Sequence, residues 1–375
     1  MIRFEDVVKV YPGGARAVDG LTFTIGEGEC VVFVGPSGCG KTTTLKLTNQ
    51  LLRPTSGRIF VAGHDIATRD PIALRRGIGY VIQEVGLLPH MTVIENVGLV
   101  PRLVGWPRAR ILTRARELLD LVGLPPGEFA TKRPHQLSGG QRQRVGVARA
   151  MAADPPVILM DEPFGALDPV TRAQLQDEFL RLRTRVRKTI LFITHDVDEA
   201  VRLGDRIAVM RSGRIVQLAP PADVLRRPAD EFVRQFVGRD RGMKLLKLAR
   251  VRDLVERRVA KAAAHDDIEI TRRMMRDAWS DTLAVVGSDG TFRGVLTFQD
   301  LEGRAGPVGR LRVRPFPTTS EDQSLHEAMA TMLVEGVAWL PVLDERGGLV
   351  GAVTMGAFAR LTAAPAEERT IPWTC

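Results

Sequence analysis

Val31–Leu52 reads VVFVGPSGCGKTTTLKLTNQLL, and this stretch decides the fold. A short β-branched run leads into Gly35-Pro36-Ser37-Gly38-Cys39-Gly40-Lys41-Thr42, and a helical pattern follows. The glycines let consecutive backbone N–H groups curl around phosphate oxygens, and the helix N-terminus adds its positive end. Lys41 is expected to reach the outer phosphates, and the Thr42 hydroxyl to ligate Mg²⁺. The stretch therefore predicts a phosphate-binding loop between a strand and a helix.

The chain around this loop alternates short apolar runs with helical patterns, which is typical of an α/β domain. Apolar residues recur at three- and four-residue intervals in Ile111–Val122, which predicts a helix within a helical insertion over about 84–150. The apolar runs predict a mainly parallel sheet, because each is bounded by polar residues or glycine, as strands covered on both faces are. These runs are Val31–Gly35, Val157–Asp161, Ile190–Thr194 and Ile207–Met210.

Two further segments contain candidate metal-binding, catalytic and phosphate-binding residues. Asp161 ends an apolar run, where a carboxylate beside a phosphate loop can hold Mg²⁺, and Glu162 next to it could orient the attacking water. Leu137-Ser138-Gly139-Gly140-Gln141 precedes a helical pattern, so a hydroxyl, free N–H groups and a helix dipole favour a second anion there. One chain with one phosphate loop is thus predicted to carry two phosphate-binding surfaces.

The composition limits the class of protein. The 375 residues suggest two or three domains, and 44% apolar with 26% charged residues exclude a mostly disordered chain. No apolar run reaches the roughly 18 residues that a membrane span needs. Cys30, Cys39 and Cys375 form neither a disulfide framework nor a metal spacing. We therefore expect a soluble, cytoplasmic protein.

The chain repeats itself at an offset of 57 residues near its end. Ala284–Leu301 (AVVGSDGTFRGVLTFQDL) aligns without a gap on Pro341–Phe358 (PVLDERGGLVGAVTMGAF), and Gly294 matches Gly351. A Met-containing helical pattern precedes each copy. Two copies of one helix–strand–turn–strand unit predict a pseudo-symmetric α+β module, with repeats at about 262–305 and 315–362.

With these motifs in order, residues 1–238 resemble an ATP-binding cassette (ABC) ATPase, whose signature is LSGGQ. The resemblance implies a P-loop NTPase fold with a RecA-like core, an antiparallel β subdomain and a helical subdomain. It implies that Tyr11 stacks on adenine, that Gln83 senses the γ-phosphate and that Asp168 lies at a dimer seam. The nucleotide-binding residues that it implies are Tyr11, Gly35, Ser37, Gly38, Cys39, Gly40, Lys41, Thr42, Thr43, Gln83, Ser138, Gly139, Gly140, Gln141 and Asp168.

In this family two copies pair head to tail, so that each LSGGQ covers the ATP in the other copy's phosphate loop. The implied cofactors are ATP and Mg²⁺, and water attacks the γ-phosphate in line. The implied catalytic residues are Glu162, which positions the water, His195, which holds the geometry, and Lys41, which with Ser138 neutralises developing charge. The implied metal ligands are Thr42, Gln83 and Asp161.

A single phosphate loop without membrane helices resembles a stand-alone ATPase subunit, most often of an importer. The resemblance implies integral-membrane permease subunits as partners, a substrate-binding protein as an indirect partner, and a place on the cytoplasmic face of the membrane. The segment after Gln83, VGLLPHMTVIENV, matches the part of this family that docks the coupling helices of the membrane subunits.

The repeats resemble tandem cystathionine-β-synthase (CBS) motifs. Thr297 and Asp300 match the nucleotide-binding positions of that motif, but Ala357 stands where the second copy should have Asp. A nucleotide site, a structural role and a non-nucleotide sensor all stay open. A CBS-tailed importer ATPase resembles the osmoprotectant uptake family, for glycine betaine, choline, carnitine and related quaternary amines. The alternatives are an importer ATPase for another small polar solute such as an amino acid, and a regulatory nucleotide-binding module with a vestigial ATPase.

The charge is unevenly distributed along the chain. The formal net charge of +9 divides into +8 for residues 1–238, +6 for a basic connector over 239–261, and −5 for residues 262–375. Few aromatic residues accompany the basic ones, which argues against nucleic acid. The connector and an arginine patch are either solvated surface or a contact for anionic lipid. The patch consists of Arg304, Arg310, Arg312 and Arg314.

Overall fold

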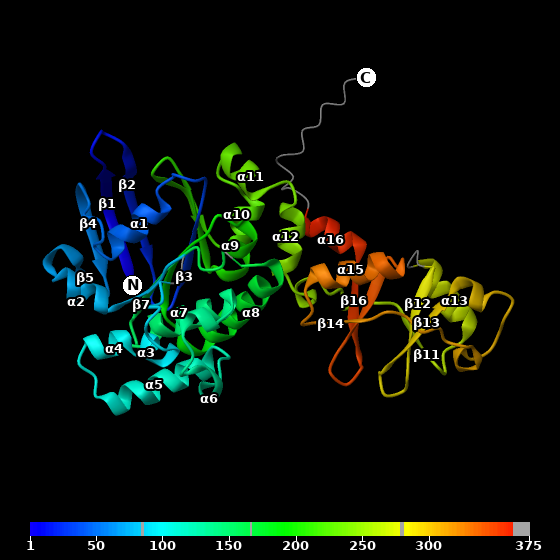
Figure 1. Ribbon diagram of the computed structural model, residues 1–375. Coiled ribbons are helices and arrows are strands. Elements are labelled where there is room, and N and C mark those ends of the chain that lie inside the picture. Colours follow the sequence, from blue (N-terminus) through cyan, green and yellow to red (C-terminus); the bar gives the residue numbers. More distant parts are fainter. Residues whose placement is uncertain (84–85, 166, 278–280, 363–375) are drawn as a thin grey trace, which may run out of the picture. The chain divides into compact units, whose positions relative to one another are not determined.

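The computed structural model describes residues 1–83, 86–165, 167–277 and 281–362. The chain divides into two compact units, Met1–Gly238 and Arg239–Cys375. Figure 1 colours the first unit from blue to green and the second from green to red. None of the described helices is long and apolar enough to cross a membrane.

The first unit is built around a six-stranded sheet in the order β10-β9-β3-β8-β7-β6. Neighbouring strands are parallel except for the β10–β9 pair, so the predicted mainly parallel sheet is confirmed. All five residues of β3 are buried, as expected for a strand covered on both faces. The strands are β3 (Cys30–Val34), β6 (Ile78–Val81), β7 (Val157–Asp161), β8 (Thr189–Ile193), β9 (Arg206–Arg211) and β10 (Arg214–Ala219).

A second, antiparallel sheet packs against this one. Its order is β2-β1-β4-β5, formed by β1 (Ile2–Val10), β2 (Arg16–Ile25), β4 (Ser56–Val61) and β5 (His64–Asp65). The two sheets share one hydrophobic core, in which Phe23 of β2 lies 5.2 Å from Phe33 of β3 between ring centroids. The antiparallel subdomain therefore shares its core with the strand that enters the phosphate-binding loop.

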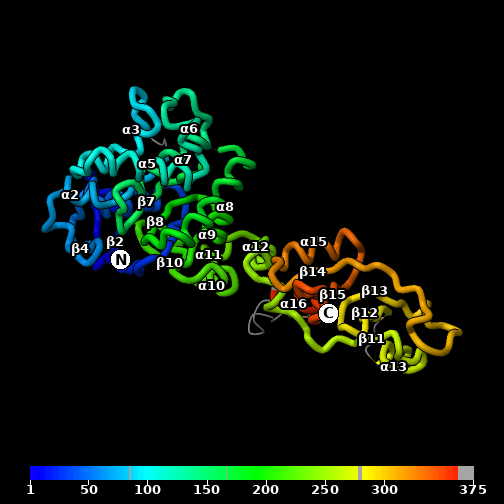
Figure 2. Tube along the Cα trace, turned by 90° about the horizontal axis from the view of Figure 1, so that it is seen from below, coloured from blue at the N-terminus to red at the C-terminus, as the bar shows by residue number. Residues whose placement is uncertain are grey.

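The helices of the first unit form two groups. A helical lobe lies at one end of the unit in both views (Figures 1 and 2) and corresponds to the predicted insertion. Its helices are α3 (Val93–Val97), α4 (Leu99–Leu103), α5 (Arg108–Leu121), α6 (Pro126–Phe129) and α7 (Gly139–Met151). The others are α1 (Lys41–Thr48), α2 (Pro71–Arg76), α8 (Pro169–Val186), α9 (Val197–Leu203), α10 (Pro221–Arg226) and α11 (Glu231–Val237).

The second unit contains the predicted repeat as two three-stranded sheets with one core each. The first has β11 (Lys261–Ala263), α13 (Ile268–Asp277), β12 (Thr282–Val286), β13 (Phe292–Thr297) and α14 (Phe298–Leu301). The second has β14 (Thr319–Ser320), α15 (Leu325–Glu335), β15 (Trp339–Leu343), β16 (Leu349–Thr354) and α16 (Met355–Thr362). Val285 pairs with Gly294 as Val342 pairs with Gly351, so the offset of 57 residues also holds for strand register.

The two repeats exchange short segments of chain. Arg314, which precedes the second repeat, forms a bridge with Val295 in the first, and Glu256, which precedes the first repeat, forms a bridge with Ala352 in the second. A Cβ at Gly294 would clash with the carbonyl oxygen of Arg314, and a Cβ at Gly351 with that of Glu256. The matched glycines are therefore explained by the close approach of the exchanged backbone.

The basic connector is folded over much of its length. Residues Arg241–Leu248 form α12, and Leu246, 1% exposed, belongs to the hydrophobic core of the second repeat. Burial of this leucine places α12 in the second unit rather than in a free linker.

Candidate functional site

The phosphate-binding loop connects β3 to α1, and Lys41 is the first residue of the helix. The Lys41 side chain is buried, and its Nζ donates hydrogen bonds to the carbonyl oxygens of Gly35, at 2.7 Å, and Pro36, at 3.0 Å. Gly40 has φ 108°, and a Cβ there would clash with the carbonyl oxygen of Ala17. The loop thus requires glycine at this position, and its own carbonyls hold the lysine ammonium in place.

Thr42 and Asp161 meet next to this loop. The Thr42 hydroxyl donates to Asp161 Oδ1 at 3.4 Å, although the two residues are 119 positions apart. Burial, and then the neighbouring Glu162 carboxylate, raises the pKa of Asp161. This carboxylate, whose charge its surroundings disfavour, is a site that a cation would stabilise.

Glu162 follows Asp161, and its carboxylate contacts two other predicted site residues, His195 and Gln83. Its Oε2 lies 3.2 Å from Nδ1 of His195 and accepts a hydrogen bond from Gln83 Nε2 at 3.3 Å. The Glu162 backbone has φ 45°, a left-handed conformation that is uncommon for a residue other than glycine. The backbone turn at the end of β7 therefore directs the carboxylate away from the strand and toward the histidine and the glutamine.

Glu162 and His195 border a cleft of about 460 Å³, whereas Gln83 and Asp161 are not among the residues that line it. Polar side chains dominate its walls, and residues from the loop, α1, the end of β7 and the end of β8 converge on it. It is lined by Ser37, Gly38, Gly40, Lys41, Thr42, Thr43, Glu162 and His195. Tyr11 adjoins the first turn of α1, with its hydroxyl 3.4 Å from Thr43 Oγ1.

The signature segment is a helix N-terminus that does not line this cleft. Ser138 caps α7, because its Oγ accepts from the Gln141 backbone N–H at 3.3 Å while Gln141 Oε1 accepts from the Ser138 N–H at 2.9 Å. Asp168 caps α8, and its side chain accepts from the Thr171 N–H at 3.0 Å without a reciprocal bond among the described residues. Ser138, Gly139, Gly140, Gln141 and Asp168 are all absent from the residues that line the cleft.

A buried polar cluster beneath His195 was not predicted from the sequence. Thr194, Glu199 and Gln176 are 2%, 4% and 7% exposed and bond to one another. Burial raises the pKa of Glu199, against the opposing effect of its hydrogen bond from Thr194. Sequence offers one signal for it: Glu199 stands directly before Ala200 and Val201 in a short helix whose apolar positions predict a buried face.

In the second unit, Thr297 and Asp300 bond to each other. Asp300 Oδ2 accepts from the backbone N–H of Thr297 at 2.8 Å and from its hydroxyl at 2.7 Å, and Asp300 Oδ1 accepts from Arg314 at 2.7 Å. The pair therefore forms a capping box for α14. A charged cavity of about 700 Å³ lies in the second repeat instead, bordered by residues that include Arg252, Arg257 and Asp344.

We predict that an Asp300→Ala variant loosens α14. Losing a helix cap costs about 1 kcal/mol, so backbone hydrogen exchange over residues 297–302 should accelerate roughly fivefold by mass spectrometry. Glu302→Ala, an exposed change two residues further on, is the control and should leave exchange nearly unchanged. Equal rates in wild type and Asp300→Ala would contradict the capping role.

We predict that thiol alkylation inactivates the protein at Cys39, slowly and only from the nucleotide-free form. Cys39 lies in the phosphate-binding loop but is 4% exposed, and Lys41 Nζ is 3.7 Å from its sulfur. Cys30 is fully buried, which raises its pKa to about 12 and makes it unreactive. A Cys39→Ser variant should therefore keep its ATPase activity in the reagent. Inactivation of this variant at the wild-type rate would exclude Cys39 as the reactive thiol.

The phosphate-binding loop after β3, the carboxylate pair at the end of β7 and the histidine after β8, between them in the sheet, together define a P-loop ATPase of the ABC kind. The sequence pattern of the ABC transporter family matches residues 18–165, and that of the CBS domain matches residues 308–363. The first unit is similar in structure to the ATP-binding cassette MJ0796 in a dimeric, post-hydrolysis state bound to ADP and Pi. That likeness has a TM-score of 0.54 and 35% identity, covering 59% of this chain and 99% of the other.

The chain belongs to the ABC transporter ATP-binding subunits that carry a CBS tail. It is 45% identical to the glycine betaine/carnitine/choline transport ATP-binding protein OpuCA of Bacillus subtilis (strain 168), over 96% of this chain and 95% of that one. It is 41% identical to the osmoprotectant import ATP-binding protein OsmV of Salmonella typhimurium (strain LT2), again over 96% and 95%. Three predictions are therefore confirmed: membership of the ABC family, the fold class, and an ATP hydrolase coupled to transport.

Proposed function

We propose that this protein hydrolyses ATP to power uptake of a small osmoprotectant, such as glycine betaine, choline or carnitine, through a separate membrane protein. The observation that carries the proposal is the set of relatives that match almost the whole chain, including its tail, and are themselves osmoprotectant transport ATP-binding proteins. The intact cleft with Lys41, Glu162 and His195 favours an active enzyme over a vestigial ATPase.

The donor atoms at Thr42 and Asp161 fit a magnesium ion. Mg²⁺ prefers oxygen ligands and binds through one or two carboxylates together with substrate phosphates, and here a hydroxyl and a partly buried carboxylate lie 3.4 Å apart. Bound there, the ion would neutralise charge on the phosphates. Gln83 donates to Glu162, so its amide oxygen remains available as a further ligand.

The side chains around the cleft would bind the phosphates, orient the attacking water and contact the adenine ring. Lys41 would exchange its bonds to loop carbonyls for bonds to phosphate oxygens, and Glu162 would accept a hydrogen bond from the attacking water and orient it. His195 would bond to the γ-phosphate with the ring nitrogen that does not face Glu162. Tyr11, beside Thr43, would stack on the adenine ring.

We also propose that two copies pair to complete the sites. Ser138–Gln141 forms a second helix N-terminus suited to phosphate, yet it does not line the cleft of its own chain. If this segment covered the cleft of another copy, one ATP would contact the phosphate-binding loop of one chain and the helix N-terminus of the other. The neighbouring Asp168 would then lie at the seam between the copies.

The helical lobe is the proposed contact for the membrane subunits, which would hold the protein at the cytoplasmic face of the membrane. Within the lobe, Asn96 is fully buried and bonds to Leu88 and Met91, which fixes the segment after Gln83, while Leu103 and Val104 are 47% and 41% exposed. Val85, the first residue of the proposed docking segment, lies outside the described residues, as does Glu84 before it. Exposed apolar side chains in the lobe suit contact with another protein.

Transport by the complex reconstituted with its membrane subunits in vesicles tests the function. Labelled glycine betaine, choline and carnitine are offered with ATP inside, with an amino acid as the competing solute. We expect ATP-dependent uptake of at least one quaternary amine. Uptake of the amino acid alone would overturn the proposed substrate class. A complex that hydrolyses no ATP would overturn the proposed enzyme activity.

The tail is proposed to regulate this activity, and its arginine patch to contact anionic lipid. Arg304, Arg310 and Arg312 are exposed, and each cationic side chain near an anionic surface contributes about 1 kcal/mol. Arg314 is also exposed but pairs with Asp300. Sedimentation with vesicles across a salt series tests the lipid contact: binding should require anionic lipid and weaken with salt, and equal binding to neutral vesicles would exclude it.

A further inference from the structure

Helix α8 contacts two functional segments of the first unit through opposite faces. Gln176 and Glu178 are two positions apart, about 200° around a helix, so they point away from each other. Gln176 faces the segment that carries His195, and Glu178 faces α7, which begins at the signature residues. Asp168 caps the N-terminus of the same helix.

On the first face, a buried chain of hydrogen bonds joins α8 to the backbone around His195. Thr194 Oγ1 donates to Glu199 Oε2 at 2.6 Å, and Gln176 Nε2 donates to Glu199 Oε1 at 3.0 Å. Thr194 Oγ1 also accepts from the Asp196 N–H at 3.0 Å, so its hydroxyl holds the residues on both sides of His195. Arg202 Nη1 donates to Gln176 Oε1 at 2.9 Å, so both ends of the Gln176 amide are bonded.

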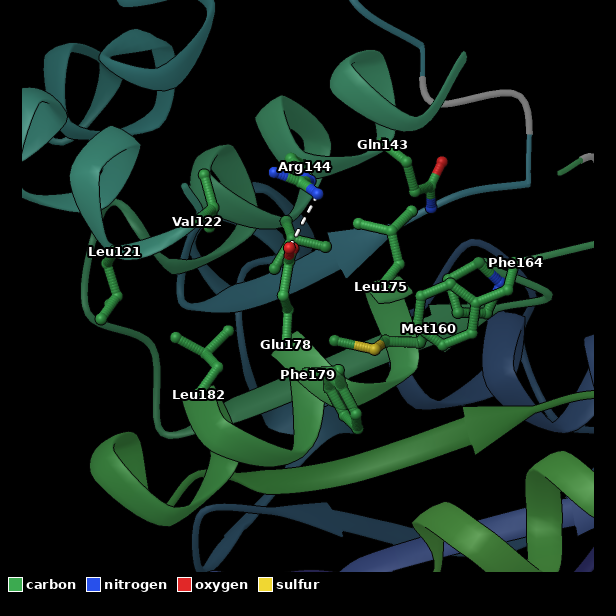
Figure 3. A pocket seen from close by; sticks show the side chains of 12 residues that line it. Leu121, Val122, Gln143, Arg144, Met160, Phe164, Leu175, Glu178, Phe179 and Leu182 are labelled. Atoms are coloured by element: carbon green, nitrogen blue, oxygen red, sulfur yellow. Dashed lines mark ion pairs between the residues drawn. The ribbon is translucent and has the colours of Figure 1, made fainter. Parts of the chain in front are cut away.

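On the second face, an ion pair joins α8 to the signature helix. Arg144 Nη2 of α7 lies 2.7 Å from Glu178 Oε1, and Figure 3 shows this pair beside an apolar pocket. The α8 side chains Leu175, Phe179 and Leu182 line that pocket. Gln143 lies in the same interface, 3% exposed, and its amide nitrogen finds no acceptor among the described residues. In the part of the chain that the structure describes, the contact between α7 and α8 therefore depends on one charged pair and apolar packing.

We propose that Glu199 is a positioning residue, and that Thr194, Glu199, Gln176, Glu178 and Arg144 form a relay from the His195 segment through α8 to the signature helix. The inference rests on the proposed function, because it assumes the paired arrangement. There, His195 serves the ATP of its own chain, whereas the signature helix covers the ATP of the other. The relay would make occupancy of one site alter the geometry of the second.

The relay can be tested by exchanging the residue types at positions 176 and 199, because one side chain donates the hydrogen bond and the other accepts it. In Glu199→Gln, one bond is lost whichever way the new amide turns. Its nitrogen faces either the amide nitrogen of Gln176, where both groups are donors and rotating Gln176 turns that nitrogen toward Arg202, or the Thr194 hydroxyl, which then loses the acceptor for its proton. In Gln176→Glu, two carboxylates face each other. The double variant Glu199→Gln/Gln176→Glu restores every bond, because the carboxylate at 176 accepts from both the new amide and Arg202.

The readout is the ATP dependence of hydrolysis in the complex with the membrane subunits, where the two copies are already paired. We expect the Hill coefficient to fall from about 2 to about 1 in each single variant and in Arg144→Gln, with kcat reduced roughly tenfold and KM nearly unchanged. The double exchange should restore both values. Gln174→Glu on the exposed side of α8, and Glu117→Gln in an exposed pair of α5, are the matched controls.

The outcomes separate the relay from the function on which it rests. Failure of the wild-type complex to assemble or hydrolyse ATP would overturn the proposed function. A cooperative wild type with equally cooperative single variants would overturn the relay alone. A double variant that stays as impaired as the single ones would also overturn it, since the restored bonds would then not matter.

Discussion

A Glu162→Gln variant should bind ATP with near wild-type affinity, accumulate as an ATP-bound dimer and lose at least about 10²-fold in kcat. Glutamine keeps the size of the side chain and can still accept from Gln83, but it cannot take a proton from water. The positive φ of Glu162 is set by the turn after β7 and does not depend on the charge. Binding and hydrolysis should therefore separate in this variant.

Size-exclusion chromatography with light scattering measures the dimer, and phosphate release measures turnover. Glu128→Gln, which removes an exposed charge in the helical lobe, is the control and should hydrolyse ATP normally. Wild-type turnover in Glu162→Gln would remove Glu162 from the reaction. A hydrolytically dead variant that never dimerises with ATP would leave the enzyme assignment intact but exclude the paired arrangement.

A Lys41→Ala variant should lose both binding and hydrolysis. The Lys41 ammonium is buried and already directed into the loop by two carbonyl oxygens, so little reorganisation is needed for it to meet phosphate. Hydrogen bonds to charged groups contribute about 1.5–3 kcal/mol, which corresponds to roughly 10- to 100-fold in ATP affinity. Because the ammonium also neutralises charge in the transition state, hydrolysis should fall further than binding.

Fluorescent-nucleotide titration and phosphate release give the two quantities separately. The control is Lys132→Ala, which removes an exposed lysine that pairs with Glu128. Unchanged ATP affinity in Lys41→Ala would mean that the ammonium stays on the loop carbonyls when nucleotide binds. The loop would then hold phosphate through its backbone N–H groups alone.

Local patterns in the sequence predicted the parts of the site that lie within one segment. The glycines before Lys41, the strand before Asp161 and the helix start after Ser138 each belong to a run of a few residues, so they could be predicted without knowledge of the fold. The repeat was predictable for a related reason, since Gly294 and Gly351 recur at one spacing and each accommodates an approaching backbone.

Tertiary packing determines the features that were missed. Gln176 and Glu199 are 23 positions apart, and nothing in either helix indicates that they share a buried hydrogen bond. The basic connector presented a charged pattern, yet Leu245 and Leu246 of α12 are buried. Thr297 and Asp300 matched a ligand motif, but Arg314, which binds the same carboxylate, lies 14 positions away and across an exchanged segment.

That exchange makes the two repeats of the tail depend on each other for stability. The chain that leaves the cassette contributes Leu246 and Glu256 to the repeat that comes last in sequence, while Arg314 completes the repeat that comes first. Each repeat is therefore finished by residues encoded next to the other, and truncation between them would leave two incomplete halves. The tail should melt as one cooperative unit, and a disturbance in its final strands would reach the cassette's exit segment without crossing the intervening repeat.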